Sequence, residues 1–182
     1  MKKIIVIGPG GSGKSYFSKE LSKILNIPVF HLDNIFWNKN KTHISKEEFD
    51  VRLNEILNEE SYIIDGDYSR TYEIRMKNSD TIFFFNFSLE DSLNGASSRV
   101  GTYRTDCPFI ENEFDPEFKE FLINWQIETR PKVLELLEKY KDKNIIVFNN
   151  RVEKEKYISQ IKRVEFNIHK IGYAKSSKGT HF

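Results

Sequence analysis

The chain has 182 residues, of which 38% are hydrophobic and 30% are charged. This balance is typical of one soluble globular domain with a substantial core, and it excludes an intrinsically disordered chain. The 28 Lys and Arg residues nearly balance the 27 Asp and Glu residues. The formal net charge of +1 therefore does not favour a strongly basic nucleic-acid binder.

Targeting signals and cysteine chemistry are also limited by the sequence. No apolar run approaches the length of a membrane span, and the start, Met1-Lys2-Lys3 and a short apolar run, lacks the longer stretch of a signal peptide. We therefore expect a cytoplasmic protein without a membrane partner. The single Cys107 can make no internal disulfide. With no His or Cys at ligand spacing, we predict no transition-metal site built by the protein.

Short apolar runs, often β-branched and barely alternating, recur along the chain and are separated by helical patterns. They are Ile4–Ile7, Pro28–Leu32, Tyr62–Ile64, Thr81–Phe87 and Asn144–Phe148. Such runs are typical of central strands in a parallel sheet that is covered on both faces. The predicted fold class is α/β, with three α/β/α layers and a parallel sheet of about five strands.

The first apolar run is followed by GPGGSGKS, residues 8–15, and then by a helical pattern. This segment fits G-x-x-x-x-G-K-[ST] in the strand, loop and helix context that the motif requires. Because glycine tolerates positive φ, the loop can turn its N–H groups inward around a phosphate. The predicted nucleotide-binding residues are Gly8, Gly10, Gly11, Ser12, Gly13, Lys14, Ser15 and Tyr16. A glycine-rich turn without a ligand is the disfavoured alternative.

Two side chains of this P-loop have specific expected roles. Lys14 can reach the β- and γ-phosphates of a nucleotide, and Ser15 offers a hydroxyl to Mg²⁺. The N-terminus of the following helix adds its dipole and its free N–H groups. The expected cofactors are ATP and Mg²⁺, and the fold is expected to be that of a P-loop NTPase of the nucleoside monophosphate kinase type.

Helical patterns with capping residues mark the rest of the chain. The first apolar stripe comprises Phe17, Leu21, Ile24 and Leu25. The second comprises Phe49, Leu53, Ile56 and Leu57, and its helix is expected to be capped by Ser45 with Glu48. The third comprises Leu89, Leu93, Ala96 and Val100, with Ser88 and Asp91 as the expected cap. A long helical region opens at Asp115-Pro116 and is expected to break or kink near Arg130, because Pro131 follows. A last helix is expected from about Arg151 to Lys162, with Asn150 and Glu153 at its start.

The remaining segments are expected to be an edge strand, a tail and two excursions from the core. Val164, Phe166 and Ile168 alternate with polar residues and predict an edge strand, and residues 175–182 predict a solvated tail after a single domain over residues 1–174. The polar segments 34–60 and 101–114 are candidates for an acceptor clamp and a lid. Ordinary surface loops are the equally weighted alternative.

Two aspartates follow predicted strands and are candidates for chemistry. Asp65 ends the third strand beside the P-loop, where P-loop proteins hold Mg²⁺ directly or through water. Asp33 ends the second strand, 19 residues after Lys14, where a carboxylate could accept a hydroxyl proton as general base. The alternatives are an Asp-Gly turn for Asp65 and a helix or turn cap for Asp33. We expect Phe36 and Trp37 to pack rather than to stack on a substrate.

Arginines carry a resemblance to adenylate kinases. The segment DGDYSRT, residues 65–71, resembles the D-G-F-P-R-T segment of that family with one extra residue, which implies that Arg70 binds the acceptor phosphate. Arg99 and Arg104 resemble the arginines at the base of the family's lid, and Arg130 resembles its second phosphate-gripping arginine. Such cations would neutralise charge that develops on the transferred phosphoryl group. A solvated surface arginine is the alternative for each.

The chain as a whole, over roughly residues 1–162, resembles the bacterial DNA topology modulation proteins, which are adenylate-kinase-related P-loop proteins. The resemblance rests on GPGGSGKS, HLDNIFW at residues 31–37, IIDGDYSRT at residues 63–71 and the region of Arg99. The segment that begins at Asp33 also resembles the Asp-x-Phe-Tyr segment of uridine kinases, and shikimate kinases have a comparable aspartate. An acid at this point implies a hydroxyl acceptor, whereas Arg70 implies a phosphate acceptor.

The resulting hypothesis is a phosphotransferase that moves the γ-phosphoryl group of Mg-ATP to a small acceptor, which is a nucleotide, a nucleoside or a hydroxylated metabolite. The expected partners are thus a nucleoside triphosphate and a small molecule, and direct nucleic-acid binding is not expected. The alternative from another class is a nucleotide-gated regulator that influences DNA topology, and a simple ATPase ranks below both. ATP rather than GTP is implied by the resemblance alone, and the oligomeric state is not decided by the sequence.

Overall fold

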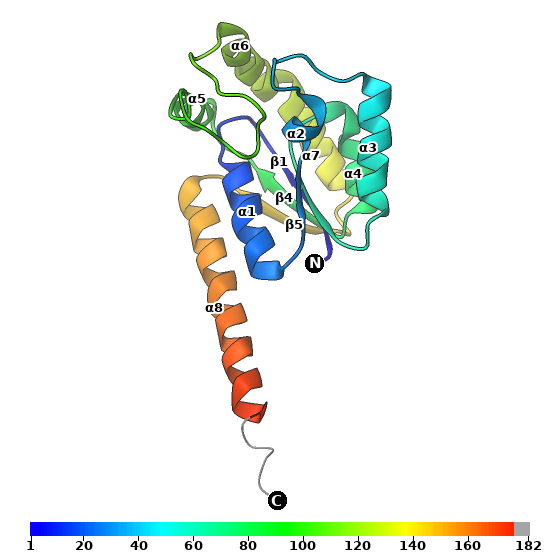
Figure 1. The fold of residues 1–182 in the computed structure, drawn as a ribbon, viewed down its shortest axis with the longest axis vertical. Helices are drawn as coiled ribbons and strands as arrows, with labels where there is room; N and C mark the ends of the chain where they lie inside the picture. Colours follow the sequence, from blue (N-terminus) through cyan, green and yellow to red (C-terminus); the bar gives the residue numbers. More distant parts are fainter. Residues whose placement is uncertain (177–182) are drawn as a thin grey trace, which may run out of the picture.

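The computed structural model describes the backbone of residues 1–176 and the side chains of residues 1–164. Helices alternate with five strands (Figure 1). The elements in chain order are β1 (Lys3–Ile7), α1 (Lys14–Leu25), β2 (Val29–His31), α2 (Leu32–Phe36), α3 (Lys46–Asn58), β3 (Tyr62–Asp65), η1 (Ser69–Thr71), α4 (Tyr72–Asn78), β4 (Thr81–Phe85), α5 (Leu89–Ser97), α6 (Pro116–Asn124), the π-helical turn η2 (Trp125–Thr129), α7 (Arg130–Lys139), β5 (Asn144–Phe148) and α8 (Arg151–Ser176).

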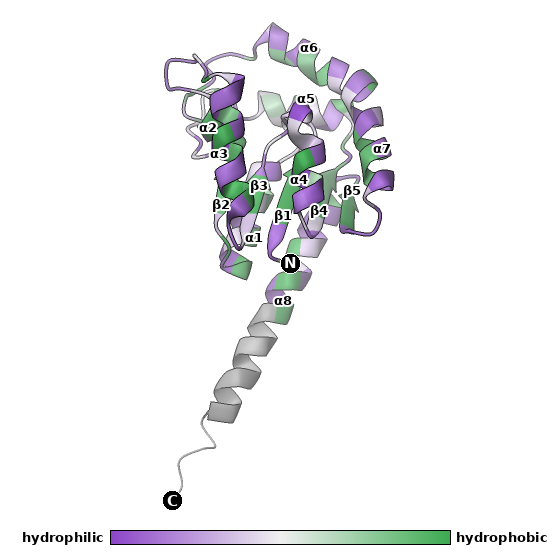
Figure 2. Ribbon diagram, turned by 90° about the vertical axis from the view of Figure 1, so that its right-hand side faces the viewer, coloured by the Kyte–Doolittle hydropathy of each residue, from purple (hydrophilic) through white to green (hydrophobic). Residues whose placement is uncertain are grey.

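The strands form one parallel sheet in the order β2-β3-β1-β4-β5. Alternate residues of β1 enter different cores, because successive side chains of a strand point to opposite faces. Ile4 and Val6 pack with Phe17 of α1 and Ile158 of α8, whereas Ile5 and Ile7 pack with residues of α3, α4 and α7. In Figure 2 the apolar residues gather on the strands and on the helix faces that cover them. The predicted three-layer α/β/α fold is confirmed.

The predicted helix starts are confirmed at several caps. The Ser45 hydroxyl accepts a hydrogen bond from the Glu48 amide at 3.1 Å, and the Ser88 hydroxyl accepts one from the Asp91 amide at 3.1 Å. The Asp115 carboxylate caps α6, with Pro at the start of that helix. The predicted interruption before Pro131 is the π-helical turn η2, which joins α6 to α7 without a break in the helical path.

Two expectations about secondary structure were wrong. The predicted edge strand at residues 164–168 is part of α8, which continues past the expected end at Lys162 to Ser176. A helix that is already under way satisfies its own backbone groups, whereas a new strand needs a neighbouring edge. The predicted tail therefore begins inside α8, and residues 177–182 lie outside the described part of the chain. The short helix α4 was missed.

The two predicted excursions differ in structure. Residues 34–60 contain α3, whose apolar stripe is buried against the sheet, so that this segment is partly core. Residues 101–114 contain no helix or strand and return across the carboxyl ends of the strands (Figure 1). We call residues 101–114 the lid. Within the described residues, no helix is both long enough and apolar enough to span a bilayer.

Candidate functional site

The P-loop is shaped by a close approach to α5. Gly11 has φ of +74°, and a Cβ atom on it would lie 2.1 Å from the carbonyl oxygen of Ser92. Only glycine fits there without displacing backbone. The Ser12 hydroxyl and the Lys14 ammonium donate to the Pro9 carbonyl oxygen at 2.8 and 2.7 Å. These contacts hold the loop at the N-terminus of α1, as the motif predicts.

A cavity of about 750 Å³ lies at the carboxyl ends of the central strands, where parallel α/β sheets bind their ligands. It contains residues from the P-loop, α2, the segment after β3, the lid and α6. Its lining includes Gly10, Gly11, Gly13, Lys14, Ser15, Tyr16, Lys19, Asp33, Phe36, Trp37, Asp65, Asp67, Tyr68, Arg99, Arg104, Asp106, Phe118 and Arg151. Six of the eight predicted P-loop residues, both aspartates and two of the four predicted arginines therefore meet around one space, whereas Gly8 and Ser12 are not part of the lining.

Lys14 is buried and faces three carboxylates. Burial lowers the pKa of Lys14, and the charges of Asp65, Asp67 and Asp33 act against that effect. An ammonium group in this position offers a concentrated positive charge to an anion entering the cavity.

Asp65 lies at the end of β3 and is almost fully buried. Its Oδ2 is 2.7 Å from Nδ1 of His31, which occupies the end of the neighbouring strand β2. Its Oδ1 has no hydrogen-bond partner among the described residues. A free carboxylate oxygen beside the P-loop, together with the Ser15 hydroxyl in the same cavity, fits a Mg²⁺ ion that keeps several water ligands. The described residues contain no cluster of three His, Cys, Asp or Glu that could hold a metal alone.

Asp33 lies in the first turn of α2, just after β2, and lines the cavity. The Tyr68 hydroxyl donates to its Oδ1 at 2.9 Å. Burial raises the pKa of Asp33, and the charge of Asp65 adds to this increase, although the Tyr68 hydrogen bond and Lys14 oppose it. A carboxyl group oriented by one oxygen and of raised pKa has the properties of a general base.

The aromatic residues after Asp33 mostly pack on the protein. The Phe36 ring stacks on His43 with centroids 4.8 Å apart, and it meets Phe49 and Tyr68 edge to face. The Trp37 ring meets the Phe109 ring of the lid edge to face, with centroids 6.0 Å apart. Both Phe36 and Trp37 also contribute to the cavity wall, so that packing and a boundary for the acceptor are compatible.

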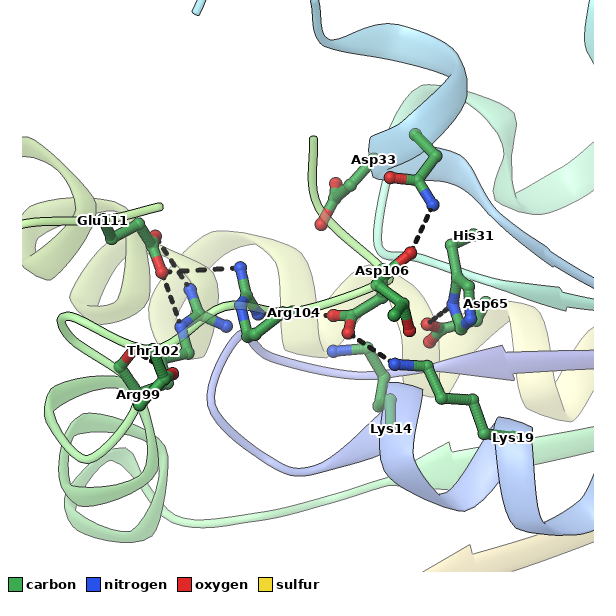
Figure 3. Close-up of polar contacts among 12 residues, drawn as sticks. Lys14, Lys19, His31, Asp33, Asp65, Arg99, Thr102, Arg104, Asp106 and Glu111 are labelled. Carbon is green, nitrogen blue, oxygen red and sulfur yellow. Dashed lines mark hydrogen bonds and ion pairs between the residues drawn. The ribbon is translucent and has the colours of Figure 1, made fainter. Parts of the chain in front are cut away.

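Ion pairs hold the lid over the cavity (Figure 3). Arg99, which lies just before the lid, and Arg104 within it both point toward Glu111, with Nε of Arg99 3.0 Å and Nη2 of Arg104 3.4 Å from its Oε2. The Asp106 carboxylate forms an ion pair with Lys19 of α1, with its Oδ1 2.8 Å from the Lys19 Nζ. The Asn34 side chain also donates to the Thr105 carbonyl oxygen at 2.8 Å. The lid thus contacts both α1 and α2.

Burial of Asp106 raises its pKa, but the hydrogen bond from Lys19 and the charges of Arg104, Lys19 and His31 outweigh this effect and leave the pKa below its usual value. Asp106 therefore stays ionised in its pair with Lys19 across the neutral pH range. The connection between lid and α1 is charged on both sides.

Two of the predicted arginines do not reach the cavity lining. Arg70 lies on the exposed surface, where its guanidinium donates two hydrogen bonds to Asp50 of α3 at 2.8 and 2.7 Å. Arg130, at the start of α7, donates to the Asn86 side chain at 2.7 Å. Asn86 follows β4 and also pairs with Asn149 after β5. The described contacts thus engage both arginines in structural pairs outside the cavity.

Sequence reasoning missed Asp67 and the role of Arg75. Asp67 lines the cavity and accepts hydrogen bonds through Oδ1 from the Tyr72 hydroxyl and from Nε1 of Trp125, the latter at 3.0 Å. Arg75 is fully buried and donates to the carbonyl oxygens of Gly66, Asp67 and Tyr68. It therefore fixes the path of the loop after β3. Only the D-G-D spacing hinted at Asp67.

The chain is similar in sequence to a shikimate kinase of Flavobacterium psychrophilum. The two are 27% identical over 138 residues, which cover 67% of this chain and 78% of that protein. No family model matches the chain. The resemblance to the DNA topology modulation proteins is not shown by these comparisons and stays a prediction.

Two solved structures show the same fold. The shikimate kinase from Acinetobacter baumannii in complex with shikimate has a TM-score of 0.59 at 15% identity, with 92% of this chain and 94% of that chain covered. A gluconokinase from Sinorhizobium meliloti has a TM-score of 0.54 at 13% identity, with 92% and 95% covered. These likenesses confirm the predicted α/β fold.

Proposed function

We propose that the protein transfers the γ-phosphoryl group of Mg-ATP to a hydroxyl group of a small acceptor. The observation that carries this proposal is Asp33, a carboxylate with raised pKa that lies in the same cavity as Lys14. A phosphate acceptor is already ionised and needs no base, whereas a hydroxyl acceptor benefits from one. The named activity of the curated relative, a shikimate kinase, supports a hydroxyl acceptor as well.

The chemistry can be assigned to residues of this chain. The acceptor oxygen attacks the γ-phosphorus, the bond from γ-phosphorus to the bridging oxygen breaks, ADP leaves, and the hydroxyl proton passes to Asp33. Lys14 neutralises charge on the phosphates. Tyr68 holds Oδ1 of Asp33 and thereby directs the carboxylate. Mg²⁺, held near Ser15 and Asp65, would supply further positive charge to the phosphates.

Arg99 and Arg104 would complete the positive charge on the donor side. Arg99 and Arg104 line the cavity beside the P-loop, and each is paired with Glu111. Their guanidinium groups are suited to phosphate oxygens, since they offer paired donors. Tyr16 and Arg151 line the cavity at the start of α1 and at the start of α8, where the nucleoside of ATP would lie. ATP rather than GTP as the donor is part of this proposal.

The test is ADP formation from Mg-ATP with the purified protein, alone and against a panel of nucleosides, nucleoside monophosphates and hydroxylated metabolites. Lys14→Ala and Asp33→Asn are measured beside the wild type. We expect an acceptor to accelerate turnover and both variants to lose that acceleration. Loss in Lys14→Ala alone would indicate a phosphate acceptor. ATP binding without acceleration by any compound would contradict the proposal.

A further inference from the structure

Asp33 and Asp67 line the side of the cavity where the proposed acceptor would lie, which we call the acceptor side, and their carboxylates are oriented in the same way. Oδ1 of Asp33 accepts from the Tyr68 hydroxyl, and Oδ1 of Asp67 accepts from Tyr72 and Trp125. Among the described side chains, none donates to Oδ2 of either aspartate. Since both residues line the cavity, each carboxylate has one oxygen fixed by the protein and one free for a ligand.

The cations that could balance an acceptor anion are engaged elsewhere. Arg70 is paired with Asp50 on the surface, and Arg130 with Asn86. Arg75 approaches the same loop, but its guanidinium is used by backbone carbonyl oxygens. The arginines that the adenylate kinase resemblance assigned to an acceptor phosphate are therefore absent from this part of the cavity, as far as the described residues show.

The cations that do line the cavity serve the donor side or the lid. Lys14 belongs to the P-loop, and Arg151 lies against the Gly11 carbonyl oxygen at 3.4 Å. Lys19, Arg99 and Arg104 are each paired with a lid carboxylate. Asp33 and Asp67 are thus left on the acceptor side without an ion-pair partner among the described residues, and Lys14 and Arg104 act on Asp33 only through longer-range charge. Once the phosphates of ATP engage Lys14, the acceptor faces a negative surface.

We propose that this site selects a hydroxyl acceptor that carries no anionic group, and that Asp67 determines this selection. The inference rests on the proposed kinase function and narrows its substrate class to neutral or cationic polyhydroxyl compounds, such as nucleosides, sugars and amino sugars. An acceptor phosphate or carboxylate would be repelled by Asp67 at short range in a partly buried site, where charges interact more strongly than in water. Hydroxyl or ammonium donors would instead bind its free oxygen.

The wall around Asp67 suits such a ligand. Tyr68 follows Asp67 in the sequence, donates to Asp33 and stacks on Phe49 with ring centroids 5.0 Å apart, so its position is fixed. Together with Phe36 and Trp37 it gives the acceptor side an apolar boundary. A ring that presents hydroxyl or amino groups to Asp33 and Asp67, and its apolar face to these rings, would satisfy both kinds of surface.

The experiment uses sets of related compounds that differ in whether they carry an anionic group. The sets are nucleosides with their 5′-monophosphates; glucose and glucosamine with glucuronate; and methyl shikimate with shikimate. Turnover is followed with labelled ATP, and equilibrium binding is followed by intrinsic Trp fluorescence in the presence of Mg²⁺ and a non-hydrolysable ATP analogue. The variants are Asp67→Asn, which keeps an acceptor for Tyr72 and Trp125, and Asp142→Asn, which removes the same charge at an exposed site.

We expect each neutral or cationic member to bind at least about tenfold more tightly than its anionic partner. Asp67→Asn is expected to reduce this ratio by about tenfold, mainly through KM, whereas Asp142→Asn leaves it unchanged. A merely structural role of Asp67 would lower kcat or thermal stability equally for all compounds. Tighter binding of the anionic members, or an unchanged ratio in Asp67→Asn, would overturn the inference.

Failure of this inference and failure of the proposed function give different results. Binding of neutral members without phosphoryl transfer would contradict the kinase function and leave the charge selection intact. Phosphorylation of an anionic member in preference to its neutral partner would support the kinase function and overturn the selection. Neither binding nor turnover with any member would contradict both.

Discussion

The P-loop and the lid both bring cations to the cavity, but different physics holds them there. In the P-loop, Lys14 is buried and is fixed by contacts within its own loop, with the Pro9 carbonyl oxygen as its acceptor. At the lid, Arg104 and the preceding Arg99 are oriented by the Glu111 carboxylate, seven and twelve residues away, and the lid is joined to α1 by the pair of Lys19 with Asp106.

The difference shows which parts of the site are prepared before a ligand binds. A loop that is fixed by backbone geometry and local hydrogen bonds keeps its shape when no ligand is bound. Ion pairs such as Arg104 with Glu111, by contrast, compete with any stronger anion, and the phosphates of ATP are such anions. We therefore expect the P-loop to be preorganised and the lid to exchange its carboxylate partners for phosphates.

The largest expected effect comes from the P-loop cation. Lys14→Met should reduce kcat on the order of 10³-fold, because a preorganised charge on the transferring phosphoryl group is lost. Lys23→Met, which removes a cation from the exposed surface of the same helix, is the control and should have little effect. Initial rates at saturating ATP measure both. A loss below about tenfold in Lys14→Met would break the comparison, because the lid would then supply the essential charge.

The second effect concerns Asp33 and pH. Since burial raises its pKa, Asp33 holds its proton to a higher pH than an ordinary aspartate, and kcat/KM should fall as the pH is lowered through that raised value. Asp33→Asn should lose on the order of 10²-fold in kcat and abolish this acidic limb. The pH profile of kcat/KM for the acceptor measures both. An unchanged acidic limb in the variant would assign it to another group.

The third effect concerns the ion pair of Lys19 with Asp106, which joins the lid to α1. Lys19→Met and Asp106→Asn should each raise KM for ATP about fivefold, and the double variant should do no worse than either, with a coupling of about 1 kcal/mol. Hydrogen exchange of the lid amides should quicken in all three variants, while exchange in the P-loop stays slow. Additive effects of the two substitutions would show that this ion pair does not hold the lid.

The smallest expected effect is at Arg70. The pair of Arg70 with Asp50 is exposed, so Arg70→Ala should change stability by less than about 1 kcal/mol and activity by less than about twofold. Thermal melts and initial rates measure this directly. A loss of kcat greater than about tenfold would show that Arg70 leaves Asp50 and enters the cavity during turnover, as the adenylate kinase resemblance implies.

The fold was largely predictable because its signals are local. Each strand is a short apolar run with its own composition, and each cap lies within three residues of the amide that it binds, as in Ser45 with Glu48. The extension of α8 and the short helix α4 were missed. In both places the local pattern was ambiguous, and the packed chain decided the outcome.

For the site, the sequence by itself determined the P-loop, Lys14, Ser15, Asp65 at the end of β3 and Asp33 just after β2, because parallel strands bring their carboxyl ends to one edge. The tertiary structure alone decided which arginines reach the cavity. A guanidinium on a long side chain takes whichever carboxylate or carbonyl lies within reach, so that Arg70 binds Asp50 and Arg75 binds the loop after β3. Asp50 is distant from Arg70 in the sequence, and the partners of Arg75 are backbone carbonyl oxygens whose direction depends on how the loop folds. No spacing pattern in the sequence reveals either kind of partner.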